Sequence, residues 1–550
     1  MTDIRAPGRI PYAGALEQPS TEHVIEMLDN DLLLEPQEPA PLAGFWEIFK
    51  KISSMSLSMA LAFTFSIELV VIGILINMSS ETEDEVASAA LTCMMLNIFC
   101  VVGMAPLFAM NVLATRQVGE LRVAENNHEN EEILQARREY ISGVGRNGLR
   151  IAMAVTPPVV AALVFAKPFL VNVLGQDEQV AALTEHFLQF YSPAIPGLML
   201  RIAIEQLMFA FGRAKQAMGF GLISLAIGSA LSVLLGNGWL GFPKLGPSGI
   251  ALGYVVEAYL TACAYSAYIA LHPDFRQFSF FRVFSRFENQ WQQLREMLWV
   301  GASIAASVSS EMAMSLSLAI FSGVLGATQQ AAMSYLSQYI SFNFLLTAGF
   351  GQGCSQELNR AVGARDYGNA SRLAKYGLVT TLIYTTTAPI IFAFAPGLLI
   401  VSSSNHSQIE ALLRYLSPIM SAGVIVDAAR YNLIQQLRVL GDVKAATIIS
   451  VSALALGIMV SGLLSVKTNM GLYGVALGYS GGIFLATPGL LYRWRQRVNP
   501  LTMRQLLEQP ERPESSSRVS QCFAGFFNRR NAANEEEMPL LRAGQVSIQV

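Results

Sequence analysis

Seven charged side chains lie inside long apolar stretches of the sequence, where charged residues are otherwise scarce. They are Glu68, Arg201, Glu205, Glu257, Glu311, Asp427 and Arg430. A charged group deep in a bilayer is costly unless it is paired, hydrated or neutralised, so such residues usually mark the path of an ion or a charged solute. Carboxylate oxygens suit a hard cation such as Na⁺, and a carboxyl group in surroundings of low dielectric can also exchange a proton. The chemistry indicated is the reversible binding of cations.

The same residues also fit a structural interpretation. Arg201 and Glu205 are four residues apart, and Asp427 and Arg430 are three apart, so each pair could form an ion pair along one helix. For Arg201 and Glu205 the two interpretations stay equally open. Glu311 and Asp427 fall near the middle of their apolar segments, and this depth favours a functional role.

The apolar segments that hold these charges are long enough to cross a membrane. Of the 550 residues, 52% are hydrophobic and 14% are charged, with a mean hydropathy of +0.41, whereas soluble domains carry about a quarter charged residues. Segments near the roughly 20 residues that a spanning helix needs occur at residues 56–78, 87–115, 151–174, 188–212, 217–240, 247–271, 297–325, 329–353, 376–402, 412–437, 445–466 and 471–492. Glu257, in the outer half of the sixth of these segments, is expected to be an interfacial or cavity-lining group. The sequence therefore predicts an all-α membrane protein with twelve spans.

The loops between these segments differ in charge on the two sides of the membrane. Lysine and arginine gather in alternate loops, around residues 116–150, 213–215, 276–295, 360–375 and 438–444. The positive-inside rule places these loops and both termini in the cytoplasm. The predicted division is a disordered cytoplasmic tail (1–45), an N-terminal lobe of six helices (46–272), a cytoplasmic linker (273–296), a C-terminal lobe of six helices (297–497) and a second disordered cytoplasmic tail (498–550).

The two halves of the chain repeat each other. The phrase GIALGY at Gly249 returns as GVALGY at Gly474, 225 residues later. Earlier in each half Glu68 corresponds to Glu311, 243 residues apart, and the loop after the second span of the first half carries extra polar residues that account for the difference. Six spans return the chain to the same side, so the halves are expected to be parallel repeats about an axis along the membrane normal.

Several classes of function find no support in the sequence. The net charge of −3 gives no reason to expect a nucleic-acid partner. The five cysteines show neither CxxC nor Cys/His spacing and are interpreted as small core residues, and no bound cofactor is expected. No HExxH, GxSxG or nucleotide-binding loop stands where it could work, which argues against an enzyme. A channel is disfavoured because two unequal lobes do not form a symmetric pore.

Three motifs resemble those of the multidrug and toxic compound extrusion (MATE) transporters, over roughly residues 45–495. They are GFGQGCSQELNRAVGARDYGNASRLAKYG at residues 349–377, GMAPLFAMNVLATRQVGE at 103–120 and GFPKLGPSGIALGY at 241–254. The resemblance implies two six-helix lobes around a central cleft. It also implies a coupling-cation site, for Na⁺ or H⁺, at Glu311 and Asp427. The first-lobe site of another branch of the family is not matched, because the first span offers Glu68 and the fifth span has no acid.

The resemblance implies a secondary active exporter of organic, cationic or amphipathic solutes, driven by antiport of Na⁺ or H⁺. A lipid-linked sugar flippase of the wider superfamily is the alternative, although such a protein is expected to line its cleft with several cations. A non-transporting membrane protein is the remaining alternative. The expected partners are a small-molecule substrate and the lipid bilayer, for a monomer in the plasma or inner membrane. The site residues expected to bind cation or substrate are Glu311, Asp427, Glu68, Glu205, Arg430 and Arg201.

Overall fold

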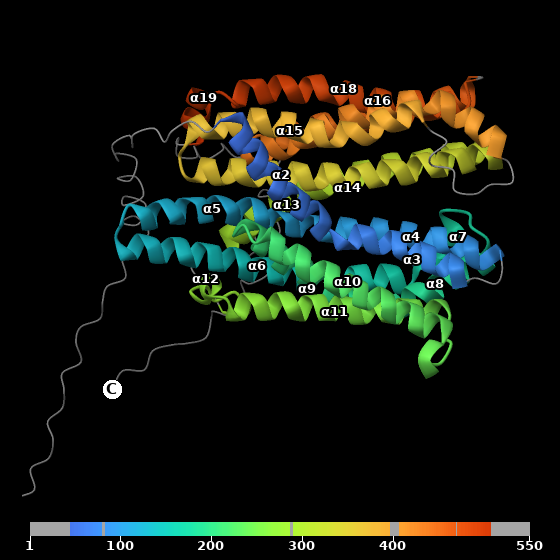
Figure 1. Ribbon diagram of the computed structural model, residues 1–550, viewed down its shortest axis with the longest axis horizontal. Coiled ribbons are helices and arrows are strands. Elements are labelled where there is room, and N and C mark those ends of the chain that lie inside the picture. Colours follow the sequence, from blue (N-terminus) through green and yellow to red (C-terminus); the bar gives the residue numbers. More distant parts are fainter. Residues whose placement is uncertain (1–43, 80–82, 286–289, 396–405, 469, 508–550) are drawn as a thin grey trace, which may run out of the picture. The chain divides into compact units, whose positions relative to one another are not determined.

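The computed structural model describes residues 44–79, 83–285, 290–395, 406–468 and 470–507 (Figure 1). Every regular element in these ranges is a helix, as predicted. The predicted tails lie outside the described residues, with two exceptions. These are residues 44 and 45, where α2 begins, and residues 498–507 with α19 (Pro500–Leu507).

The first half of the described chain forms the N-lobe. Its elements are α2 (Phe45–Ala62), α3 (Thr64–Ser79), α4 (Glu83–Met104), η2 (Ala105–Leu107), α5 (Phe108–Asn126), α6 (Glu131–Val164), α7 (Ala166–Asn172), α8 (Glu178–Tyr191), α9 (Ala194–Ala210), α10 (Ala214–Asn237), η3 (Trp239–Gly241), α11 (Pro247–Leu271) and α12 (Pro273–Arg276). Four of the six predicted spans are therefore broken helices. Proline accounts for two of the breaks, because Pro106 opens the 3₁₀ turn η2 and Pro193 stands at the 59° bend between α8 and α9.

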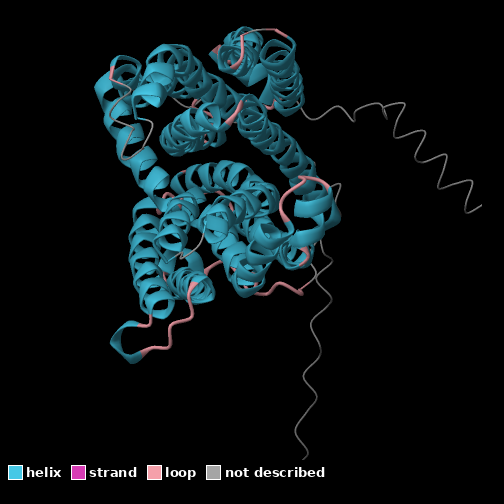
Figure 2. Ribbon diagram, turned by 90° about the vertical axis from the view of Figure 1, so that its right-hand side faces the viewer, coloured by secondary structure: helices cyan, strands magenta, loops and turns pink. Residues whose placement is uncertain are grey.

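The second half forms the C-lobe, whose helices are more continuous. Its elements are α13 (Gln290–Leu325), α14 (Ala327–Gly363), α15 (Tyr367–Phe394), α16 (His406–Val439), α17 (Val443–Gly462), the π-helical turn η5 (Leu463–Lys467) and α18 (Leu472–Arg497). Buried apolar side chains form one core between Met59 and Met297 and a separate core between Met314 and Ile483. Most helices of each lobe lie together in Figures 1 and 2, but α2 crosses to the C-lobe and packs against α14 and α15.

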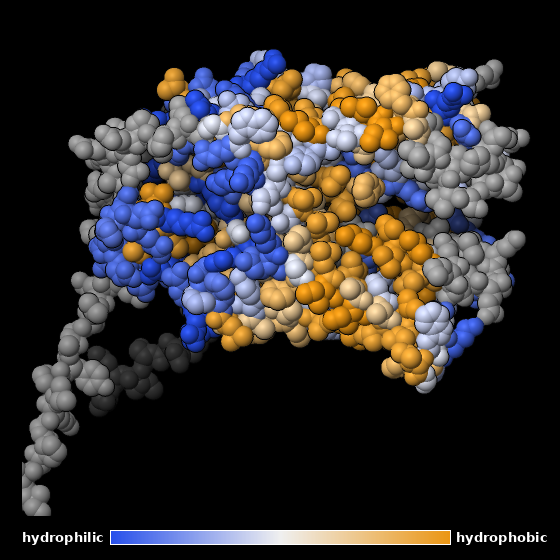
Figure 3. Space-filling view, in the orientation of Figure 1, coloured by the Kyte–Doolittle hydropathy of each residue, from blue (hydrophilic) through white to orange (hydrophobic). Residues whose placement is uncertain are grey.

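The helices are built to cross a membrane. Among the described residues, ten helices are long and apolar enough to span it, and the bent pair α8–α9 brings the number to eleven. The predicted eighth span, residues 329–353, lies in α14, which has 37 residues but carries many Ser, Gln and Asn side chains and falls outside that apolar class. On the face in Figure 3, apolar side chains gather over the middle of the helices and polar ones over the end where α5 turns into α6.

The repeated phrase packs the last two helices of each lobe together. Gly253 of α11 lies against Ser232 of α10, and Gly478 of α18 lies against Ser461 of α17, so closely that a Cβ on either glycine would collide with the serine backbone. Each serine hydroxyl donates to a carbonyl oxygen of the repeated phrase, at 2.9 and 3.2 Å. The duplicated sequence therefore encodes a duplicated helix hairpin, held by small residues as is usual in membranes.

The extra residues in the first half extend two helices. They were expected to form a polar loop after the second span, yet α5 runs to Asn126 and α6 begins at Glu131, with Asn130 capping it through its side chain. The linker to the C-lobe is held against α6, because Arg146 and Arg150 donate to the carbonyl oxygens of residues 279, 283 and 285.

The backbones of the two lobes approach each other closely near one end of the molecule. This end, here called the basic end, comprises the turns at residues 127–130, 211–213, 364–366 and 440–442 (left in Figure 1). Gly119 of α5 and Gly363 of α14 mark the crossing. A Cβ on Gly119 would come within 2.7 Å of the Arg360 carbonyl oxygen, and one on Gly363 would collide with the Arg116 carbonyl oxygen. Glycine is required for this approach of two backbones.

Gly363→Ala is expected to lower the melting temperature of the purified protein, because the new methyl group must push α5 away from α14. Gly481→Ala on α18 is the matched control, since a Cβ there meets nothing within 4 Å. Alanine favours a helix over glycine by about 1 kcal/mol, so the control should melt at the same temperature or higher. Equal melting of the two variants would show that the crossing is not tight.

Candidate functional site

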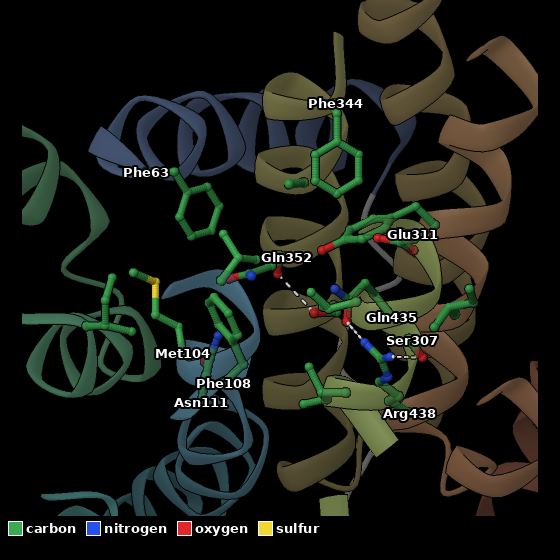
Figure 4. A pocket seen from close by; sticks show the side chains of 18 of the residues that line it. Phe63, Met104, Phe108, Asn111, Ser307, Glu311, Phe344, Gln352, Gln435 and Arg438 are labelled. Atoms are coloured by element: carbon green, nitrogen blue, oxygen red, sulfur yellow. Dashed lines mark hydrogen bonds between the residues drawn. The ribbon is translucent and has the colours of Figure 1, made fainter. Parts of the chain in front are cut away.

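A cavity lies between the two lobes and takes its wall from both. It encloses about 1160 Å³, part of it open to solvent. Figure 4 shows Phe63, Met104 and Phe108 on the N-lobe side and Phe344 on the C-lobe side, so much of the wall is aromatic or apolar. Phe63 reaches the cavity because the first span breaks there, between α2 and α3. Four charged residues also line it: Arg201, Glu205, Glu311 and Arg438.

A buried ion cluster stands on the N-lobe side of the cavity. Arg201 Nη1 donates to both carboxylate oxygens of Glu257, at 2.8 and 3.0 Å, and Arg201 Nη2 lies 3.8 Å from Glu68 Oε2. The Tyr191 hydroxyl donates to Glu68 Oε1 at 2.7 Å. The cluster therefore joins α9 to α11 and α8 to α3 through charge-assisted hydrogen bonds, which are the stronger kind, and α9 to α3 through a longer ion pair.

The structure decides one open alternative in this lobe and corrects one expectation. The ion pair considered for Arg201 and Glu205 along α9 does not form, because Arg201 forms its ion pairs with acids of α11 and α3. Glu257 was expected at an interface or in the cavity wall, but it is fully buried and does not line the cavity. The reason is the packing of α9 against α11, which offers Arg201 a two-oxygen partner across the helices.

Arg201→Gln is expected to destabilise the protein by about 3–5 kcal/mol, because it leaves buried carboxylates without their cation. Thermal melting of the detergent-solubilised protein measures the effect. Arg213→Gln is the control: its pair with Asp274 is partly exposed, and such pairs contribute about 0–1 kcal/mol. If both variants melt alike, the N-lobe cluster does not hold its helices together.

Glu205 is the acid of this lobe's cavity wall that Arg201 does not bind. Its side chain is 1% exposed and lines the cavity, and its Oε1 has no hydrogen-bond partner. No cation of the described residues lies within ion-pair distance of it. A buried carboxylate without a partner is unfavourable, so Glu205 is prepared to take up a cation or a proton.

The C-lobe side holds a second ion cluster, built around Arg430. Arg430 Nε donates to Asp427 Oδ1 at 2.6 Å, Nη2 donates to Glu311 Oε1 at 3.0 Å, and Nη1 donates to Ser450 Oγ at 2.8 Å. The ion pair considered for Asp427 and Arg430 thus forms, and it extends to α13. Glu311 lines the cavity, while Asp427 and Arg430 lie behind it. Among the described residues no group of three His, Cys, Asp or Glu side chains is arranged to hold a metal ion.

The two clusters follow the repeat. Each joins a glutamate of the first helix of its lobe, Glu68 or Glu311, to an arginine of the fourth helix, Arg201 or Arg430. By the 225-residue offset Arg430 corresponds to Glu205, which is one helical turn beyond Arg201. Each cluster has two carboxylates for one guanidinium group, so with both acids ionised it is one positive charge short.

Sequence reasoning missed Arg438, which it placed in a cytoplasmic loop. The residue lies on the last turn of α16 and is 6% exposed. Its guanidinium donates to Gln435 Oε1 at 3.1 Å and to Ser307 Oγ at 2.9 Å (Figure 4). The predicted span ended one residue too early. The signal for a longer helix was Gly441, whose positive φ ends the segment.

A third cluster, also missed, joins the lobes at the basic end. Arg360 of α14 donates from Nη1 to Glu357 Oε1 at 2.6 Å and from Nη2 to the carbonyl oxygens of Phe209 and Ala210, at 2.9 and 3.2 Å. Lys51 Nζ of α2 lies 2.6 Å from Glu357 Oε2. A C-lobe arginine thereby binds the last carbonyl groups of the N-lobe helix α9, where a positive charge is favoured.

Comparisons with known proteins agree with this architecture. The MatE family model matches residues 135–234 and 303–463. A probable multidrug resistance protein NorM of Rhizobium meliloti is 26% identical over 374 residues, 66% of this chain and 78% of that protein. A second NorM, from Bradyrhizobium diazoefficiens, is 23% identical over 433 residues, 76% of this chain and 87% of that protein.

Solved structures share the fold. The crystal structure of the eukaryotic MATE transporter AtDTX14 superposes with a TM-score of 0.70 at 18% identity, covering 84% of this chain and all of that one. An outward-facing multidrug resistance MATE transporter of the MOP superfamily gives 0.69 at 14% identity, covering 84% and 97%. The predicted twelve-helix fold is confirmed, and members of this family are transporters rather than enzymes. The family model and the NorM relatives together show that the chain is similar to the MATE family of multidrug efflux transporters.

Proposed function

We propose that the protein is a secondary active exporter of organic cations or amphipathic solutes, which it binds in the cavity between the lobes. The observation that carries this proposal is the composition of the cavity wall: aromatic side chains from both lobes surround two carboxylates, Glu205 and Glu311. Aromatic faces and carboxylates both attract an organic cation. A lipid-linked sugar flippase is expected to line its cleft with several cations, whereas this wall has two arginines, and Arg201 is already paired with Glu257.

Coupling to H⁺ or Na⁺ follows from the charges around the cavity. Glu205 lacks a cation, and the Glu311–Asp427–Arg430 cluster keeps one more carboxylate than it has guanidinium groups. Each site gains by binding a positive charge, supplied by the coupling ion or by the substrate. When one displaces the other, the occupancy of the sites changes, and this difference can bias which side the cavity faces.

The contacts between the lobes support alternating access. At the basic end Asn359 donates to the Val112 carbonyl oxygen at 2.6 Å and Gln356 donates to Asn111 Oδ1 at 2.9 Å, next to the Gly119–Gly363 crossing. With the basic end in the cytoplasm, this conformation is closed to the inside. We place the protein in the plasma or inner membrane, as a monomer with both termini cytoplasmic.

The test is transport in proteoliposomes with independently imposed pH and Na⁺ gradients. A fluorescent organic cation should accumulate against its own gradient only when the matching ion gradient is present, and an ionophore that collapses that gradient should abolish accumulation. Vesicles without protein are the control. Equilibration of the cation through the protein whatever the ion gradient would contradict antiport and indicate a passive pore.

A further inference from the structure

We infer that Glu205 and Arg438 form the two poles of one binding site, which takes an organic zwitterion with its amine at Glu205 and its carboxylate at Arg438. The inference rests on the proposed function, since it names the substrate class for the same cavity. It adds an anion-binding pole that an exporter of plain organic cations does not need.

Two of the four charged groups in the cavity wall are already paired. Glu311 is bound by Arg430 at 3.0 Å, and Arg201 is bound by Glu257 at 2.8 Å. These groups belong to ion pairs within their own lobes. The remaining charged groups of the wall are Glu205 from α9 and Arg438 from α16.

Arg438 is buried and binds neutral acceptors. Its partners are Gln435 Oε1 and Ser307 Oγ, and its Nε has no hydrogen-bond partner. In the described part of the chain no carboxylate lies within ion-pair distance of it. A guanidinium group presents a planar fork that suits a carboxylate, so an anionic group in the cavity would give Arg438 the counter-ion that the described residues do not supply.

Glu205 supplies the opposite pole from the other lobe. It is 1% exposed, and its Oε1 has no partner. Gln352 of α14, which also lines the cavity, offers a second buried oxygen without a partner. Both acceptors suit a primary or secondary amine, which carries a positive charge and donates hydrogen bonds.

The two poles lie apart along the helices. By the 225-residue repeat, Glu205 of α9 corresponds to position 430 of α16. Arg438 lies eight residues beyond position 430, and eight residues of α-helix rise about 12 Å along the helix axis. The wall also includes Phe63, Phe108 and Phe344. The ligand that fits is therefore elongated and aromatic, with its amine and its carboxylate at opposite ends.

Three probes on one rigid scaffold test the site. They are 4′-(aminomethyl)biphenyl-4-carboxylic acid, its methyl ester, which keeps only the amine charge, and its N-acetyl derivative, which keeps only the carboxylate. Affinities are measured by calorimetry on the full chain in lipid nanodiscs, so the result does not depend on transport. The zwitterion should bind about tenfold or more tightly than either derivative, as a lost hydrogen bond to a charged group costs that much.

Variants assign the poles. Arg438→Gln should abolish the preference for the acid over the ester and leave ester binding intact, which also shows that the variant is folded. Glu205→Gln should weaken the acid and the ester but not the N-acetyl compound. Arg438→Lys should keep part of the preference. The control is Arg213→Gln, the position that corresponds to Arg438 by the repeat, because Arg213 pairs with Asp274 outside the cavity and should change nothing.

The outcomes separate this inference from the proposed function. Three outcomes would overturn the two-pole site: equal binding of the acid and the ester, no binding of the acid, or an unchanged preference for the acid in Arg438→Gln. They include the case in which Glu205 and Arg438 serve only to pair with each other. Export of the ester in proteoliposomes would then still support the exporter. Tight, Arg438-dependent binding of the acid without ion-driven export of any of the three probes would support the site and contradict the exporter.

Discussion

Asp427→Asn and Glu311→Gln, made singly, are expected to reduce ion-driven efflux to the level of vesicles without protein. Both carboxylates bind Arg430, at 2.6 and 3.0 Å. The cluster of two carboxylates and one guanidinium group requires one further positive charge, whereas either variant leaves a neutral pair that requires none. Coupling should therefore be lost while folding is kept, since Arg430 retains one charged partner. The measurement is gradient-driven transport of a fluorescent cation in proteoliposomes.

The control for this experiment is Glu410→Gln, an exposed position on the same helix, α16. It makes the same chemical change away from the cluster and should transport normally. Normal efflux by Asp427→Asn would remove the C-lobe cluster from the coupling step. If transport by Glu311→Gln depends on the ion gradient as it does in the unmodified protein, Glu311 has no part in the coupling step.

Arg360→Gln is expected to open the basic end. The guanidinium binds the last carbonyl groups of α9 and the carboxylate of Glu357. Hydrogen bonds to charged groups contribute about 1.5–3 kcal/mol each, so losing them should raise the share of the open conformation by an order of magnitude or more. The measurement uses Ala348→Cys, a position in the cavity wall, and a maleimide that does not cross membranes. In the Arg360→Gln background this cysteine should become reactive from the basic side.

The comparison variant is Lys215→Gln, which removes an exposed positive charge at the same end. It should leave the labelling pattern unchanged, with the cavity cysteine protected from the basic side. If the cavity cysteine is protected from the maleimide equally well in Arg360→Gln, the Gly119–Gly363 crossing alone closes the basic end and Arg360 contributes nothing to its closure.

Hydropathy and repetition were sufficient to predict the fold. Apolar segments of spanning length located most of the long helices to within a few residues at one end or the other, because the bilayer requires such segments. The short helices α8, α12 and α19 were not predicted. The repeated phrase around Gly253 and Gly478 predicted two equivalent lobes, and the structure gives its physical reason in the paired serine–glycine contacts of the last two helices. These features are local in sequence and therefore visible in it.

The partners of the buried charges were not visible in the sequence. Spacing suggested that Arg201 pairs with Glu205 four residues on, yet α9 packs so that Arg201 meets Glu257, 56 residues away. Arg360 and Arg438 were assigned to loops, because hydropathy falls where helices become polar although the helices continue to Gly363 and Val439. A long-range contact depends on how helices are rotated against each other, and one sequence does not fix that rotation.

The most direct test is to ask whether substrate and coupling ion exclude each other at these acids. Purified protein in weakly buffered solution receives a saturating organic cation, and released protons are followed by pH and released Na⁺ by a selective electrode. We predict that a cation is released for each substrate molecule bound, and that Asp427→Asn releases less. Binding of substrate without release of either ion would contradict the exchange on which the proposed transport depends.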